Sequence, residues 1–239
     1  MEAYTYTNIF DTKGIEYIVI IFFLMLLIPF WIIVNRKSDA LIRLTQQIKA
    51  LTTNVLNIPK GLFFSRNHTW LQLEKSGEAR VGIDDFLLKV LGAVTVYPLK
   101  SPGDTVKKGE AIALVEQSGK EIKMHSPVSG KITGFNIELI DEEFAFSGDP
   151  YGEGWLFTLQ PDNWKAETAG YLLGNESENW MERELQRLKD FLNVTFSRYS
   201  DPSMLLVYQE GGELQMNPLS NLEAEVWDDF QKEFLEQTG

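Results

Sequence analysis

The strongest hydrophobic signal in the chain is an uninterrupted apolar run near its N-terminus. Residues 17–34 (YIVIIFFLMLLIPFWIIV) form an 18-residue stretch without a charge. A helix of this length is roughly 27 Å long at about 1.5 Å per residue, close to the roughly 30 Å hydrocarbon thickness of a bilayer. A buried core helix normally shows a polar face, and this stretch has none. The pattern predicts a transmembrane helix over 15–35, preceded by a short extracytoplasmic segment, 1–14.

The charges around this run favour an anchor over a cleaved signal peptide. The residues before it contain three acids and one lysine, whereas a signal peptide begins with a basic region and ends at small residues. Basic residues follow the run instead, at Arg36, Lys37 and Arg43. The positive-inside rule then places the N-terminus outside and the main domain in the cytoplasm. We expect a single-pass anchor in the inner (cytoplasmic) membrane.

An amphipathic segment over 36–58 follows the predicted anchor. Its apolar residues have the alternating spacing of three and four that is typical of an a/d helical seam: Leu41, Leu44, Ile48, Leu51 and Val55. Pro59 is expected to end this connecting helix, because the residue before a proline disfavours helix. Two interpretations stay open. The seam packs on a partner helix, or it lies on its own domain or on the membrane surface.

From Leu62 the pattern changes to short apolar runs separated by glycine, proline and charge. Seven runs have the composition of strands: 63–74, 78–84, 93–99, 110–117, 121–128, 130–137 and 154–160. Between them, only 84–91 (DDFLLKVL) has a helical pattern. Many short strands with glycine-rich turns predict a mainly β domain over 59–165, built as a small sandwich or barrel.

The C-terminal region, 166–239, is predicted to contain helices and a hairpin. NESENWMERELQRLKDFLN (175–193) has helical periodicity, and a hairpin is expected to turn at Gly211-Gly212. Ser220 and Glu223 have the spacing of a capping box, so a second helix is expected over 221–236. This helix carries an apolar stripe of Leu222, Val226, Trp227, Phe230 and Phe234. The stripe either docks on a partner subunit or packs on its own domain.

Composition excludes several classes of function. The net charge is −12, and 15 acidic residues against 6 basic ones lie between Lys165 and the C-terminus, so nucleic acid is not an expected partner. The chain has no cysteine, which excludes disulfides, iron–sulfur clusters and thiolate zinc sites within it. With two histidines and no phosphate-binding loop, we predict no metal site, no resident cofactor and no enzymatic activity.

Six short motifs stand in order along the central domain. They are HTW (68–70), VGIDDF (81–86), LG (91–92), PGDTVKKGE (102–110), SPVSG (126–130) and DPYGEGWL (149–156). Together they resemble the glycine cleavage system H protein family, over less than half of the chain. The resemblance implies a lipoyl/biotinyl-type flattened β-barrel (a barrel-sandwich hybrid) that displays a hairpin turn at one end. In this family a lysine at that turn carries lipoate, which shuttles an aminomethyl group between enzymes.

The resemblance also implies where that lysine belongs. In lipoyl and biotinyl relatives it lies eight residues before the proline of the return strand and three after the glutamate of a Val-Glu pair. Counting back from Pro127 and forward from Glu116 both lead to Gly119. Lys120 lies one residue later and Lys123 four residues later. Because side chains of a hairpin alternate between two faces, a displacement by one residue turns the amine to the wrong side.

These observations lead to a functional hypothesis with alternatives. We expect a non-catalytic, membrane-anchored structural or assembly subunit of a redox or respiratory (electron-transport) complex. Its degenerate, non-lipoylated H-protein-like domain would contact other subunits, with Leu41, Leu44, Ile48, Leu51, Val226, Trp227, Phe230 and Phe234 as candidate partner-binding residues. The alternative is a membrane-tethered carrier of the glycine-cleavage or a related type, with lipoate on Lys120. A third possibility is an anchor that recruits soluble enzymes through the acidic C-terminal helix.

Overall fold

The computed structural model describes residues 17–28, 51–137, 148–199, 214 and 216–236. The chain divides into two compact units, Met1–Ile48 and Lys49–Gly239. In the first unit, residues 17–28 are helical and their side chains are exposed. Within the described ranges, no helix combines the length and apolar character that a membrane crossing needs. The rest of the predicted anchor, 15–16 and 29–35, lies outside the described residues, as do Leu41, Leu44 and Ile48.

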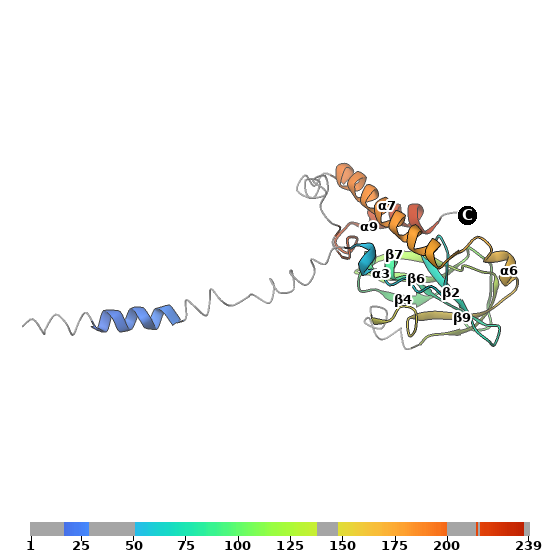
Figure 1. The fold of residues 1–239 in the computed structure, drawn as a ribbon, viewed down its shortest axis with the longest axis horizontal. Helices are drawn as coiled ribbons and strands as arrows, with labels where there is room; N and C mark the ends of the chain where they lie inside the picture. The colour runs from blue at the N-terminus through green and yellow to red at the C-terminus, as the bar shows by residue number, and fades with distance from the viewer. Residues whose placement is uncertain (1–16, 29–50, 138–147, 200–213, 215, 237–239) are drawn as a thin grey trace, which may run out of the picture. The chain divides into compact units, whose positions relative to one another are not determined.

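The second unit is built around two antiparallel sheets (Figure 1). Its strands are β1 (Phe63–Phe64), β2 (Thr69–Leu73), β3 (Ala79–Ile83), β4 (Thr95–Pro98), β5 (Thr105–Val106), β6 (Ala111–Gln117), β7 (Lys120–His125), β8 (Gly130–Phe135), β9 (Trp155–Pro161) and β10 (Leu172–Leu173). The larger sheet has the order β10-β1-β2-β3-β9-β8-β5 and the smaller one β4-β6-β7. Every run that the sequence analysis assigned to a strand contains one, so the mainly β fold class is confirmed.

The core lies between the two sheets and follows the two-residue period of the strands. Val96, Val115 and Ile122 are in register across the smaller sheet, and all three are buried. The larger sheet contributes Trp70 and Phe157, which are fully buried. Burial of each such side chain stabilises the fold by about 1.5–3 kcal/mol. The two sheets therefore hold each other in place, and the β6–β7 hairpin belongs to the smaller one.

Two motif glycines allow chain segments to approach closely. A Cβ at Gly82 would lie 2.6 Å from the indole of Trp70, and one at Gly130 would lie 2.2 Å from the carbonyl oxygen of Gln160. Both distances are too short for any side chain. Gly82 thus makes room for the fully buried Trp70 on β2, and Gly130 lets β8 pair with the end of β9.

The helix predicted over 84–91 is confirmed as α3 (Asp85–Leu91). Asp84 is its N-cap, and the Oδ1 atom of Asp84 accepts a hydrogen bond from the Leu87 N–H at 2.9 Å. Gly92 ends the helix with a φ of 93°. The VGIDDF and LG motifs therefore mark the start and the end of one short, buried helix.

The DPYGEGW motif forms a tight turn before β9. Asp149 accepts a hydrogen bond from the Gly152 N–H at 2.9 Å. The ring that anchors the turn is Tyr151, which is buried and whose hydroxyl accepts a hydrogen bond from the Asp85 N–H at 3.0 Å. Trp155 at the end of the motif is only half-buried. The turn is thus held against α3 through a tyrosine.

The predicted connecting helix over 36–58 is wrong in the part that the structure describes. Residues 51–58 contain only a single 3-10 turn, η1 (Thr53–Val55). Leu51 is 1% exposed, and its N–H donates to the carbonyl oxygen of Leu214 at 2.6 Å. Leu51 is therefore a core residue of the second unit and not a free partner-binding position. The seam is interrupted at Leu51, which packs into this core, while Val55 is only partly buried.

In the C-terminal region, the described residues form four helical elements. They are α6 (Trp164–Glu167), α7 (Asn175–Tyr199), α9 (Ala224–Phe230) and η2 (Gln231–Leu235), a π-helical continuation of α9. The helix predicted over 175–193 is confirmed as α7. The capping box is absent, because α9 begins after Glu223 without a side-chain cap and the Ser220 hydroxyl donates to the Asn217 carbonyl oxygen. The hairpin expected at Gly211-Gly212 lies outside the described residues.

The apolar stripe of the last helix packs on its own domain. Val226, Trp227, Phe230 and Phe234 are each at most 3% exposed. Phe191 of α7 makes edge contacts with Phe230 and Phe234, at centroid distances of 6.0 and 5.7 Å. The interpretation of these four residues as a partner-binding surface is corrected, because the side chains are already covered within the chain.

Candidate functional site

The β6–β7 hairpin ends in a two-residue turn. Gln117 and Lys120 form its last pair, so Ser118 and Gly119 make the turn itself. Their φ angles are 53° and 80°, and positive values at both positions are what a type I′ turn requires. The Gly119 N–H donates to Oε1 of Glu116 at 2.5 Å, which fixes the turn from one side.

The tip of this turn displays a residue without a side chain. Gly119 is exposed, and a Cβ built on it would meet no atom within 4 Å. Space for a projecting arm is therefore present at the position that the resemblance assigns to the lipoyl lysine. The amine that would carry the arm is missing there.

Lys120 is held by a distant part of the chain, residues 216–236, which we call the C-terminal segment. Its Nζ atom donates to the carbonyl oxygens of Ser220 and Leu222, at 2.6 and 3.1 Å. The same atom lies 5.0 Å from the ring centre of Trp227, within the range of a cation–π contact. Two of the three ammonium donors are thus used inside the chain. The amine points to the C-terminal segment and not to open solvent at the tip.

A groove of about 390 Å³ runs between the hairpin and the last helix. One wall comes from the hairpin, including Lys120 and Lys123, and the other from α9 and η2, including Asp228 and Gln231. The Lys123 N–H donates to Oε1 of Gln231 at 2.9 Å. This bond ties the outer strand of the small sheet to the C-terminal segment, so one side of the hairpin is covered.

A second polar cluster, fully buried, surrounds His68. Its Nδ1 lies 2.8 Å from Oδ2 of Asp84, and its Nε2 lies 3.7 Å from Oε2 of Glu184 on α7. The imidazole is stacked between Phe86 and Trp180, at centroid distances of 4.4 and 4.9 Å. Burial alone lowers the pKa of His68, but the two carboxylates outweigh it and raise the pKa to about 9. This histidine is therefore charged at neutral pH.

The His68 cluster joins the H-protein-like sheet to the C-terminal helices. Asp84 caps α3, Glu184 belongs to α7, and Phe234 of η2 lies 6.4 Å from the imidazole centroid. The histidine of the HTW motif therefore takes part in a buried ion pair that links these elements.

The stability of the protein is expected to fall between pH 6.5 and pH 9. The pKa of His68 is about 9 in the folded state and 6.5 in the unfolded state. A raised folded pKa gives a stabilisation that is complete below pH 6.5 and is lost as the pH rises through 9. The expected loss is about 3 kcal/mol. Urea unfolding at pH 6.5 and at pH 9 measures this loss of stability. A His68→Gln variant that loses as much stability over the same pH range would contradict the assignment of the loss to His68.

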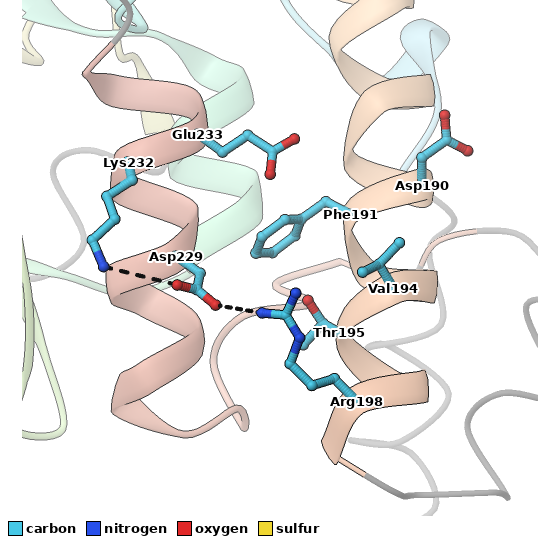
Figure 2. A pocket seen from close by; sticks show the side chains of 8 residues that line it. All are labelled: Asp190, Phe191, Val194, Thr195, Arg198, Asp229, Lys232 and Glu233. Atoms are coloured by element: carbon cyan, nitrogen blue, oxygen red, sulfur yellow. Dashed lines mark hydrogen bonds and ion pairs between the residues drawn. The ribbon is translucent and has the colours of Figure 1, made fainter.

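A second cleft lies between α7 and the last helix (Figure 2). It measures about 470 Å³ and is crossed by an ion pair of Arg198 with Asp229 at 3.3 Å, with Lys232 on the other side of Asp229 at 3.9 Å. Phe191 and Val194 form its floor on the α7 side. Within the described part of the chain, no three or more His, Cys, Asp or Glu side chains are grouped to hold a metal ion.

Sequence reasoning located the turn but missed what covers it. Gly119 and Lys120 stand where the motif spacing places them. The contacts of Lys120 with Ser220 and Leu222 span 100 and 102 residues. No sequence pattern links positions so far apart. The apolar stripe of the last helix was the one sequence feature that hinted at this cover, because packing on its own domain was one of its two interpretations.

Comparison with known protein families gives a single consistent match. Residues 62–184 match the family described as "Glycine cleavage H-protein". The glycine cleavage system H protein of Psychrobacter cryohalolentis is 37% identical over 123 residues, which are 52% of this chain and 97% of that protein. The protein of the same name from Thermus thermophilus is 38% identical over 106 residues, 44% of this chain and 82% of that protein.

A solved structure is similar over the same part of the chain. The crystal structure of a glycine cleavage system H protein from Mycobacterium marinum is 28% identical, with a TM-score of 0.45. The similarity covers 52% of this chain and 98% of that one. The N-terminal 61 residues and those after residue 184 lie outside the family match.

Proposed function

Because this chain belongs to the glycine cleavage H-protein family, we propose that it keeps the family's fold but uses it for protein contact without a lipoyl arm. The observation that carries this proposal is the hairpin tip. Gly119 lies in the turn at the tip, where the family resemblance places the arm, and the neighbouring amine of Lys120 is bonded to the carbonyl oxygens of Ser220 and Leu222. A carrier needs an amine that a ligase can reach, and the described residues of this hairpin offer none that is free at the tip.

A second candidate function keeps the activity of the relatives. On this proposal Lys120 carries lipoate, and the chain acts as a carrier in a glycine-cleavage or related system. The comparisons favour this candidate more directly than a contact role, because the curated relatives described above are all named glycine cleavage system H proteins. The geometry opposes it, since lipoylation would require Lys120 to leave two carbonyl oxygens and the Trp227 ring.

We further propose that residues 15–35 anchor the chain in the inner membrane, with the H-protein-like domain on the cytoplasmic side. The support is the 18-residue uncharged run and the basic residues that follow it. The partners would be other subunits of a membrane-associated complex, with redox or respiratory complexes as the expected setting. Neither proposal assigns an enzymatic activity to this chain, since H proteins act as carriers.

Detergent extraction of membranes tests the contact role. The full chain, tagged at its C-terminus and expressed at its natural level, is expected in the membrane fraction. After solubilisation it should co-purify with at least one other protein in a fixed ratio. Recovery of the chain alone from the soluble fraction would contradict both the anchor and the stable contact, and would favour a diffusing carrier.

A further inference from the structure

The C-terminal segment is fastened to the hairpin at two polar points. One is the hydrogen bond from the Lys123 N–H to Oε1 of Gln231, and the buried Val226, Trp227 and Phe230 add apolar packing. The other is Lys120, whose ammonium bonds two carbonyl oxygens that lie immediately before α9. Trp227 contacts the same ammonium with its ring and donates from Nε1 to the Leu219 carbonyl oxygen at 2.9 Å. The turn that leads into α9 is therefore shaped around one positive charge.

These interactions depend on the charge of the amine. Hydrogen bonds from a charged donor contribute about 1.5–3 kcal/mol, more than neutral ones. A cation–π contact adds about 0.5–1 kcal/mol at an exposed site. Residues before the turn are tied elsewhere, because the Asn217 and Leu219 N–H groups donate to the carbonyl oxygens of Lys89 and Val90 in α3. Loss of the charge would thus loosen the turn and the start of α9, while the segment stays attached at 217–219.

We propose that Lys120 is a clamp that closes the C-terminal segment over the hairpin. While Lys120 is charged, the segment covers one side of the hairpin and narrows access to the groove of about 390 Å³. When the charge is removed, the turn at 220–223 moves off the hairpin and the groove opens. This inference goes beyond the proposed function, since it concerns what covers the tip whether or not the tip carries an arm.

Hydrogen exchange of the full chain in detergent tests the clamp with a matched pair of variants. Lys120→Gln removes the charge at similar length, and Lys120→Arg keeps it. In the Gln variant the amides of Leu222, Val226 and Trp227 are expected to exchange about tenfold faster or more. In the Arg variant they should stay within about threefold of the unmodified chain. Amides in the middle of α7, such as that of Leu188, are expected to be unchanged in both.

Three results would overturn the clamp. Unchanged exchange at 222–227 in the Gln variant would show that apolar packing alone holds the segment. Equal acceleration in the Gln and Arg variants would show that charge is not the cause. Acceleration that spreads equally to α7 would show that Lys120 supports the whole domain instead of closing one segment. Neither variant can be lipoylated at position 120, so the comparison of the Gln variant with the Arg variant does not depend on the lipoylation state of the parent chain.

Discussion

Replacement of His68 by alanine is expected to lower the free energy of unfolding by about 3–5 kcal/mol. Removal of His68 leaves the buried Asp84 carboxylate without its ionic partner, and breaking a buried ion pair costs about this much. Glu184 keeps its ion pair with Arg187 at 3.0 Å. Here Asp84 is fully buried, and Glu184 is nearly so. The stacking of the imidazole between Phe86 and Trp180 is lost as well. Urea unfolding at pH 6.5 measures the effect.

A matched control for this variant is the exposed ion pair of Arg198 with Asp229. The two side chains are 62% and 38% exposed, and pairs of this kind contribute about 0–1 kcal/mol. Arg198→Ala should therefore change stability by less than about 1 kcal/mol. If His68→Ala were as mild as Arg198→Ala, the buried cluster would not be what joins the sheet to the C-terminal helices.

Introduction of a lysine at the hairpin tip is expected to create a lipoylation site. In a Gly119→Lys variant the amine would stand where the family resemblance places the arm, in space that holds no other atom within 4 Å. The positive φ of 80° makes this substitution cost about 1–2 kcal/mol of stability, which a domain with this core tolerates. Co-expression with a lipoate ligase, followed by intact mass and peptide mapping, should find one lipoyl group at position 119.

Gly109 provides the matched control for the lysine variant. It also lies in a turn with a positive φ, of 82°, and a Cβ there also meets no atom within 4 Å. Gly109→Lys thus carries the same backbone strain at a different turn, and it should gain no lipoyl group. An unmodified Gly119→Lys, in cells that lipoylate an ordinary H protein, would contradict the assignment of the arm position.

Local signals in the sequence were sufficient to predict the H-protein-like domain. The strands could be predicted because their apolar runs have the period of a sheet and are bounded by glycine and proline. The helix α3 could be predicted because Asp84 and Gly92 mark its two ends. The turn itself could be located because two independent spacings lead to Gly119, and the turn there has the geometry that a glycine suits. Its assignment as the arm position stays a prediction.

Tertiary contacts decided what the sequence left open. The periodicity of Leu51 and Val55 fits a helix, but Leu51 packs into the core and bonds Leu214, so the chain is not helical there. From its sequence, the apolar stripe around Trp227 could pack on a partner surface or on its own domain. The contact of Lys120 with a residue a hundred positions later shows that the segment packs on its own domain. Pairwise contacts at such separations leave no trace in local patterns.

The most direct test of the proposal that no arm is attached is the intact mass of the natural protein, purified from cells that contain lipoate and its ligase. We predict the mass of the unmodified polypeptide, with peptide 115–130 free of any adduct. A chain heavier by one lipoyl group, with the adduct mapped to Lys120, would contradict the account and establish the chain as a carrier.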